Sequence, residues 1–263
     1  MFFPGSPADS LGRRKCNVIF RVGMFAKRIY LGKYSSTCIH KQMHRRVNMN
    51  AKVIGIIQVK GGAGRSTLST NLAGELSKIG TTVLIDADMP QGTSASWYSL
   101  RKQAGRAGAL SAATAANHHE LIERVEELRH AADFIVLDGP PRIAEMTRAS
   151  LMLSDLCLLP VGASLAEIWA TDDVLSLIEQ ARKVRPVDAR MIWTRHRSRT
   201  RLAEELGSQA GEELGLPILK VAMGLRVAYI EALGAGLTAA EMSDPNARME
   251  TRFMAAEICR ILG

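Results

Sequence analysis

The most informative segment of the sequence is the glycine-rich run Val59-Lys60-Gly61-Gly62-Ala63-Gly64-Arg65-Ser66-Thr67. It follows an apolar run at residues 53–59 and precedes a segment, 68–79, in which leucine recurs at helical spacing. Three glycines in four positions allow successive backbone N–H groups to point at one anion, and the N-terminus of the following helix adds partial positive charge. The stretch therefore predicts a phosphate-binding loop, with the Ser66 hydroxyl placed to bind Mg²⁺.

The rest of the chain alternates between strand and helix patterns. Segments of helical periodicity separate the apolar runs. Ser164 and Glu167 form a capping box that predicts a helix through Ala181, and Asp244 with Pro245 predicts the start of the last helix. This alternation predicts an α/β fold, a single doubly wound, mainly parallel sheet with helices on both faces. The apolar runs, which are typical of strands buried on both faces, are residues 53–59, 82–85, 134–137, 156–161 and 189–193.

Composition excludes several classes of protein. Hydrophobic residues make up 47% of the 263 residues and charged residues 23%, which is enough to bury a core. No apolar stretch approaches the roughly 18–20 residues of a membrane-spanning helix. The four cysteines are scattered and form no C-x-x-C pair, which argues against a disulfide scaffold or a cysteine-rich metal site and favours a reducing cytoplasm.

The basic charge is concentrated in residues 1–48, which hold ten basic residues and one acid. Residues 49–263 hold 24 basic and 25 acidic residues, so the first segment carries a net charge of +9 and the rest of the chain −1. We expect two regions, a basic extension at 1–48 and a P-loop domain at 49–263. Three interpretations of the extension stay open: a disordered arm that binds nucleic acid, an organellar leader, or a start codon assigned upstream of Met49.

Three motifs together resemble those of the ParA/MinD family of ATPases. The loop resembles the family's deviant Walker A motif, K-G-G-x-G-K-[ST], with its early lysine at Lys60. Residues 85–92, Ile-Asp-Ala-Asp-Met-Pro-Gln-Gly, resemble the D-x-D-P-Q-G segment, and residues 134–141 resemble the Walker B strand with its D-x-P-P turn. The resemblance covers residues 53 to about 262, and the chain is most similar to the small plasmid-partition ParA proteins.

The resemblance implies a set of roles and two cofactors, ATP and Mg²⁺. Lys60 corresponds to the signature lysine, which in the family reaches the phosphates bound by the partner of a dimer. Asp88 corresponds to the acid that positions the attacking water, and Lys60, Asp88 and Arg65 form the expected catalytic set. Ser66, Asp86 and Asp138 are the expected Mg²⁺ site. The expected nucleotide-binding residues are Lys60, Gly61, Gly62, Ala63, Gly64, Arg65, Ser66 and Thr67.

Two departures from the family pattern bear on turnover. Arg65 stands where the family has a second lysine, and a guanidinium is a planar fork where an ammonium is a point charge. Met89 is an additional residue between Asp88 and Pro90, in the segment that positions water. We therefore expect nucleotide binding with weak ATP hydrolysis.

A dense basic run follows the 189–193 strand. Its four alternating arginines suggest contact with a phosphate backbone without base readout, and a solvated charge run is the alternative. The resemblance implies non-specific DNA binding by an ATP-bound homodimer, a ParB-like or other cargo adaptor that stimulates the ATPase, and a cytoplasmic, nucleoid-associated location in bacteria. The apolar stripe of the final helix is expected to pack in the core and not on a membrane. The DNA-binding candidates are Arg195, Arg197, Arg199 and Arg201.

Two other functions are compatible with these motifs. The departures at Arg65 and Met89 also suit a nucleotide-dependent DNA-binding module with little or no hydrolysis. A small-molecule ligase on the same fold is a further alternative, although the sequence reveals no substrate-carboxylate pocket. The leading prediction is a ParA-like ATPase acting in plasmid or chromosome partition or in cargo positioning.

Overall fold

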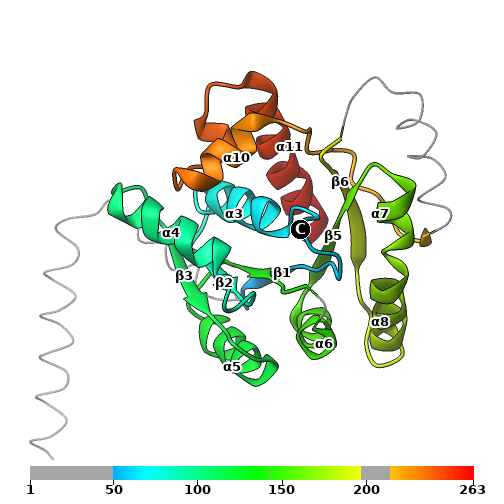
Figure 1. Ribbon diagram of the computed structural model, residues 1–263. Helices are drawn as coiled ribbons and strands as arrows, with labels where there is room; N and C mark the ends of the chain where they lie inside the picture. The colour runs from blue at the N-terminus through cyan, green and yellow to red at the C-terminus, as the bar shows by residue number, and fades with distance from the viewer. Residues whose placement is uncertain (1–49, 142, 197–213) are drawn as a thin grey trace, which may run out of the picture. The chain divides into compact units, whose positions relative to one another are not determined.

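The computed structural model describes residues 50–141, 143–196 and 214–263 (Figure 1). The segment 1–48 and three of the candidate arginines, Arg197, Arg199 and Arg201, lie outside the described residues. The strands are β1 Lys52–Ile56, β2 Thr82–Asp86, β3 Leu110–Thr114, β4 Phe134–Asp138, β5 Leu156–Gly162 and β6 Ala189–Thr194. The helices are α3 Arg65–Leu76, α4 Thr93–Gln103, α5 His118–Leu128, α6 Ala144–Leu153, α7 Leu165–Trp169, α8 Asp172–Arg182, α10 Val227–Gly234, the 3-10 turn η1 Ala239–Glu241 and α11 Pro245–Leu262.

The described strands form one parallel sheet in the order β3-β2-β4-β1-β5-β6. β1 lies between β4 and β5, and the chain reverses direction across the sheet at this point, which is where open α/β sheets bind ligands. The predicted doubly wound parallel fold is confirmed. The edge strand β3 was not predicted, because its sequence, Leu-Ser-Ala-Ala-Thr, is only partly buried and lacks the branched apolar run of the inner strands.

Helices cover both faces of the sheet, with α3 and α11 on one side and α5, α6 and α8 on the other (Figure 1). Successive residues of a strand point to opposite faces. Ile54 and Ile56 accordingly pack in the cluster that holds the leucines of α3, whereas Val53 packs with Leu121 and Val125 of α5. Strands buried on both faces explain why their sequences read as continuous apolar runs.

Two helix boundaries and the burial of one helix face differ from the sequence-based prediction. The helix expected from Ser164 to Ala181 is divided into α7 and α8 at Thr171, whose hydroxyl donates to the Glu167 carbonyl at 3.0 Å. The helix after the loop ends at Leu76, so Ile79 lies beyond it. In α11 the apolar stripe is only partly core, because Met254 and Ile258 are buried but Phe253 is 57% exposed.

The helix that follows the loop, α3, is tied to the C-terminal part of the chain. The Asn71 side-chain oxygen accepts from the backbone N–H of Ala239 at 2.7 Å. One helical turn further on, a Cβ added at Gly74 would lie 2.2 Å from Cγ2 of the fully buried Thr238. Gly74 therefore allows η1 to approach α3 closely, although glycine is a weak helix former.

This contact gives a stability prediction. Gly74→Ala improves helix propensity but forces Thr238 away, so we expect a loss of about 1–3 kcal/mol of unfolding free energy. Thr238→Ser removes Cγ2 and keeps the hydroxyl that contacts Glu241. In urea unfolding, the double variant should recover most of the loss caused by Gly74→Ala. If Gly74→Ala lowers the unfolding free energy by the same amount in the wild type and in the Thr238→Ser background, the close contact is contradicted.

Candidate nucleotide-binding site

The glycine-rich loop joins β1 to α3 and has the backbone shape of an anion cradle. Gly62 and Gly64 have φ values of 75° and 93°, in the left-handed region that favours glycine, and Gly64 is the N-cap of α3. A Cβ built on Gly61 or Gly62 would meet nothing within 4 Å, so the space above the loop is open. The open cradle at a helix N-terminus fits the phosphates of a nucleotide.

Two buried aspartates lie at neighbouring strand ends beside the loop. Asp86 and Asp138 end β2 and β4, are directly paired in the sheet and are both fully buried. Asp138 accepts from Ser69 Oγ at 3.0 Å and from Ser94 Oγ at 2.5 Å, and it also interacts with the Ser66 hydroxyl. Burial raises the pKa of Asp138 to about 6, against the opposing effect of these hydroxyls.

The arrangement assigns different work to the three expected acids. Asp86 uses its two oxygens to accept from the backbone N–H groups of Asp88 and Ala95, at 3.0 and 2.9 Å, and so fixes the segment between β2 and α4. The Asp138 carboxylate interacts with the Ser66 hydroxyl, and together they offer the oxygen atoms that a Mg²⁺ ion and its water shell would need. Asp88 is less buried than either, and burial raises its pKa.

Arg65 is buried between the loop and the end of β4. Its Nε donates to the Gly139 carbonyl at 2.8 Å, and its Nη1 donates to the carbonyls of Gln58 and Lys60 at 2.8 and 2.7 Å. Nη2 lies 3.8 Å from Asp88 Oδ2. The side chain thus cross-links the start of the loop to the Walker B turn. The planar fork that was expected to bind phosphate donates here to main-chain carbonyls.

Lys60 and Arg195 meet at a residue that sequence reasoning treated only as a helix cap. Glu167 Oε1 lies 2.8 Å from Lys60 Nζ and 2.9 Å from Arg195 Nη2. Burial by itself raises the pKa of Glu167, but the hydrogen bonds and charges of the two cations hold it below the usual value. The Ser164 hydroxyl caps α7 as expected, whereas the Glu167 carboxylate binds these cations. Of the three residues, only Lys60 was predicted from the sequence to belong to the nucleotide site.

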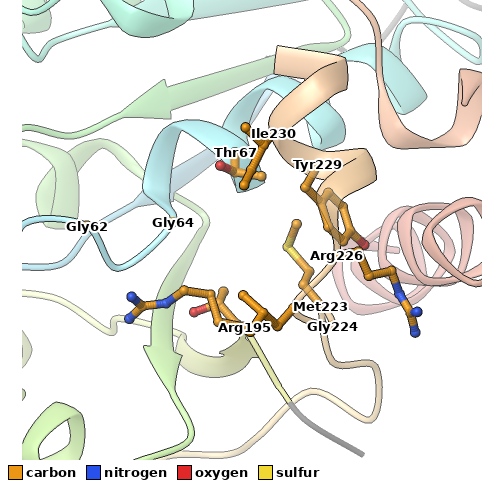
Figure 2. Close-up of a pocket in the computed structure, with 11 residues that line it drawn as sticks. Gly62, Gly64, Thr67, Arg195, Met223, Gly224, Arg226, Tyr229 and Ile230 are labelled. Carbon is orange, nitrogen blue, oxygen red and sulfur yellow. The ribbon is translucent and has the colours of Figure 1, made fainter. Parts of the chain in front are cut away.

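A pocket opens next to the loop, between the end of β6 and α10 (Figure 2). Its walls are mostly apolar, with Ile230 of α10 next to Thr67 of α3, whereas the Tyr229 hydroxyl on the same helix donates to Glu250 of α11 at 2.9 Å. Arg195 reaches towards the loop, whereas Arg226 points away, towards α11, and binds Glu250. The lining residues are Gly62, Gly64, Thr67, Thr194, Arg195, Met223, Gly224, Leu225, Arg226, Tyr229 and Ile230.

The structure brings together the loop, Asp86, Asp88 and Asp138, as expected, and adds Ser69, Ser94 and Glu167. Arg195 is the one predicted DNA-binding residue within the described segments, and it lines the pocket beside the glycine-rich loop. Among the described residues, no group of three or more His, Cys, Asp and Glu side chains is arranged to hold a metal ion by itself. No described helix is long and apolar enough to cross a membrane.

Residues 52–210 match the family described as ATPase MipZ. The chain belongs to the MipZ family of ATPases. This assignment confirms the resemblance to ParA/MinD ATPases that the loop and strand-end motifs predicted.

Relatives of this MipZ-family chain include a carboxysome-distribution protein and a chromosome-partitioning ATPase. Maintenance of carboxysome distribution protein A from Halothiobacillus neapolitanus is 28% identical over 190 residues, which are 72% of this chain and 86% of that protein. The chromosome-partitioning ATPase Soj from Thermus thermophilus is 25% identical over 250 residues, which cover 81% and 98% of the two chains. The fold matches the ATP complex of a Cyanothece McdA variant with a TM-score of 0.68 at 17% identity, covering 81% of this chain and 98% of that one.

The Arg65 geometry gives a prediction that separates a structural role from a phosphate-binding role. Arg65→Lys cannot reach three carbonyls in one plane, so we expect the unfolding free energy to fall by about 1–3 kcal/mol. Arg124→Lys, at an exposed ion pair on α5, is the matched control and should change stability little. The measurement is chemical denaturation without nucleotide. An Arg65→Lys variant as stable as the control would mean that the cross-link is dispensable.

Proposed function

We propose that this chain is a ParA-type positioning ATPase that binds ATP and Mg²⁺, dimerises through Lys60 and binds DNA without sequence preference. The observation that carries the proposal is the pairing of two buried strand-end aspartates beside an open glycine cradle, in a chain of an ATPase family. In this assignment the loop and the α3 N-terminus hold the phosphates, and Ser66 with Asp138 would hold Mg²⁺. Asp86, which was also expected at the metal, has both carboxylate oxygens engaged by backbone N–H groups. The metal supplies charge neutralisation at the phosphate oxygens.

The pocket between β6 and α10 is the natural place for the nucleoside. It adjoins the loop, and its apolar lining suits a base better than a second phosphate. Asp88 would orient the attacking water from the segment that Asp86 fixes. Lys60 keeps about a third of its side-chain surface exposed, which supports a role towards a second copy of the chain.

The wider role rests on the relatives. One relative is a carboxysome-distribution protein and another is a chromosome-partitioning ATPase. A similar role for this chain would need an adaptor protein that stimulates the ATPase. DNA would be the surface on which the ATP-bound dimer collects, in the bacterial cytoplasm at the nucleoid. The alternating arginines at 195–201 are the residues proposed to contact its phosphates.

One observation favours a second candidate, a nucleotide-dependent DNA-binding module with little hydrolysis. The Arg65 side chain donates to carbonyls, so it leaves the β- and γ-phosphate oxygens with one cation fewer than a lysine in the same place would supply. Loss of such a group lowers rate more than affinity. The two candidates share the nucleotide site and differ only in turnover.

The metal assignment predicts the effect of Ser66→Ala. The variant should lose about tenfold or more of the ATP affinity that depends on Mg²⁺, and should keep the affinity measured with EDTA. Titration calorimetry provides both values. Ser99→Ala, at an exposed serine of α4, is the control and should match the wild type. Unchanged Mg²⁺ dependence in Ser66→Ala would exclude the hydroxyl as a ligand, and no nucleotide binding by the wild type would end the proposal.

The proposed dimer gives a second prediction. Lys60→Ala should bind ATP as a monomer nearly as well as the wild type, but light scattering with a slow-hydrolysing ATP analogue should detect no dimer. Lys102→Ala removes an exposed lysine of α4 and should dimerise normally. Normal dimerisation of Lys60→Ala would show that the lysine has no role towards the partner.

The proposed DNA contact is tested by replacing Arg197, Arg199 and Arg201 with alanine, which leaves Arg195 in place. The basic segment 1–48 would bind DNA with or without nucleotide, so the relevant quantity is the increase in affinity for random-sequence duplex on adding ATP. We expect the triple variant to lose that increase and to show a shallower salt dependence. A triple variant of exposed arginines elsewhere, Arg106, Arg124 and Arg148, controls for net charge. An ATP-dependent increase that survives in the first variant would identify the run as a solvated surface.

A further inference from the structure

Glu167 binds two cations through a single oxygen. Oε1 accepts from Lys60 Nζ at 2.8 Å and from Arg195 Nη2 at 2.9 Å. Oε2 is buried and has no hydrogen-bond partner. The carboxylate side chain is 11% exposed, whereas Lys60 and Arg195 are 36% and 44% exposed. The acid is thus the fixed member of the group, and each cation has a route to solvent. We call these three residues the Lys60–Glu167–Arg195 cluster.

The ends of two paired strands build the cluster. Gly162 ends β5 and is paired with Thr194, so Arg195 follows directly beside the turn that leads into α7. A Cβ on Gly162 would lie 2.9 Å from Arg195 Nη2 and 3.1 Å from Glu167 Cγ, so glycine allows the two side chains to meet across the strand end. The backbone of Arg195 is left-handed, with φ of 51°, which is unusual for a residue with a side chain.

The burial of Glu167 determines what happens when one cation leaves. A buried carboxylate without a partner is strongly unfavourable, and removing one member of a buried pair costs more than the pair contributes. If Lys60 leaves Glu167, Arg195 remains on the same oxygen and keeps the charge paired. Arg195 therefore lowers the free energy needed to separate Lys60 from the carboxylate, whereas the negative charge of Glu167 raises it.

We propose that Glu167 restrains Lys60 on its own subunit, and that Arg195 sets the strength of this restraint by competing with Lys60 for the same carboxylate oxygen. The consequence of this restraint is control of dimerisation. That consequence rests on the proposed function, in which Lys60 binds the phosphates of a partner subunit. A partner that carries a bound nucleotide must draw Lys60 from Glu167 before the dimer closes. Regulation of this kind predicts opposite effects for replacing Glu167, which holds the lysine, and Arg195, which competes with it.

The direct test is the reactivity of the Lys60 amine in the full chain without nucleotide, measured by pulse acetylation and peptide mass spectrometry. Glu167→Gln should raise the labelling rate of Lys60 by about threefold or more, because the charge that holds the ammonium is gone. Arg195→Gln should lower that rate, because Glu167 then has Lys60 as its only cation. The double variant should behave like Glu167→Gln, since Arg195 acts through the carboxylate. Glu179→Gln on α8 and Arg124→Gln on α5 make the same changes of net charge at exposed sites.

The consequence is tested by light scattering with a slow-hydrolysing ATP analogue. Glu167→Gln should dimerise at a lower protein concentration than the Glu179→Gln control, and Arg195→Gln at a higher one. Lys60 labelling that does not respond to Glu167→Gln, or that shifts in the same direction in both single variants, would overturn the proposal. If labelling responds as expected while dimerisation does not, the restraint is established and the proposed role of Lys60 in the dimer is wrong. Thermal unfolding of each variant identifies any that fail to fold, and Glu167→Ala then replaces Glu167→Gln.

Discussion

The buried carboxylate of Asp138 is the constraint around which the site is built. Taking this group out of water raises its pKa to about 6, so its ionised form needs donors or a cation. Hydroxyls of Ser69 on α3 and Ser94 on α4 meet it from two helices, and Asp86 holds the second of these helices through Ala95. The loop, β2, β4 and α4 must converge for this to happen. A parallel sheet that reverses at β1 brings them to one edge.

Arg65 gives the loop a different support from the lysine that the family motif has at this place. Its three hydrogen bonds to carbonyls join the beginning of the loop to the turn after Asp138. The same side chain lies 3.8 Å from Asp88, so it also borders the segment proposed to position water. We propose that a rigid cradle with one mobile cation fewer binds nucleotide and turns it over slowly. This combination suits a protein whose work depends on the lifetime of a bound state.

The sequence predicted the fold and the strand-end acids because those features follow from local rules. Continuous apolar runs and the strand–loop–helix order placed Asp86 and Asp138 at one edge before any contact was known. The edge strand β3 was not predicted because the apolar pattern of Leu110–Thr114 is weak. Glu167 was recognised only as a cap, since its meeting with Lys60 and Arg195 joins residues 107 and 28 positions away. The carbonyl contacts of Arg65 likewise depend on tertiary packing that no spacing in the chain encodes.

The proposed ATPase site is tested most directly by measuring ATP turnover by the full chain and by its Asp88→Asn variant. We predict slow, Mg²⁺-dependent release of phosphate by the wild type. Asp88→Asn should lose that release and retain ATP binding, because the proposed role of the acid is to orient water and not to hold the nucleotide. Glu127→Gln, at an exposed acid of α5, should keep the wild-type rate. Turnover by Asp88→Asn equal to that of the wild type would contradict the assigned site. An absence of turnover in a wild type that binds ATP would favour the non-hydrolysing module.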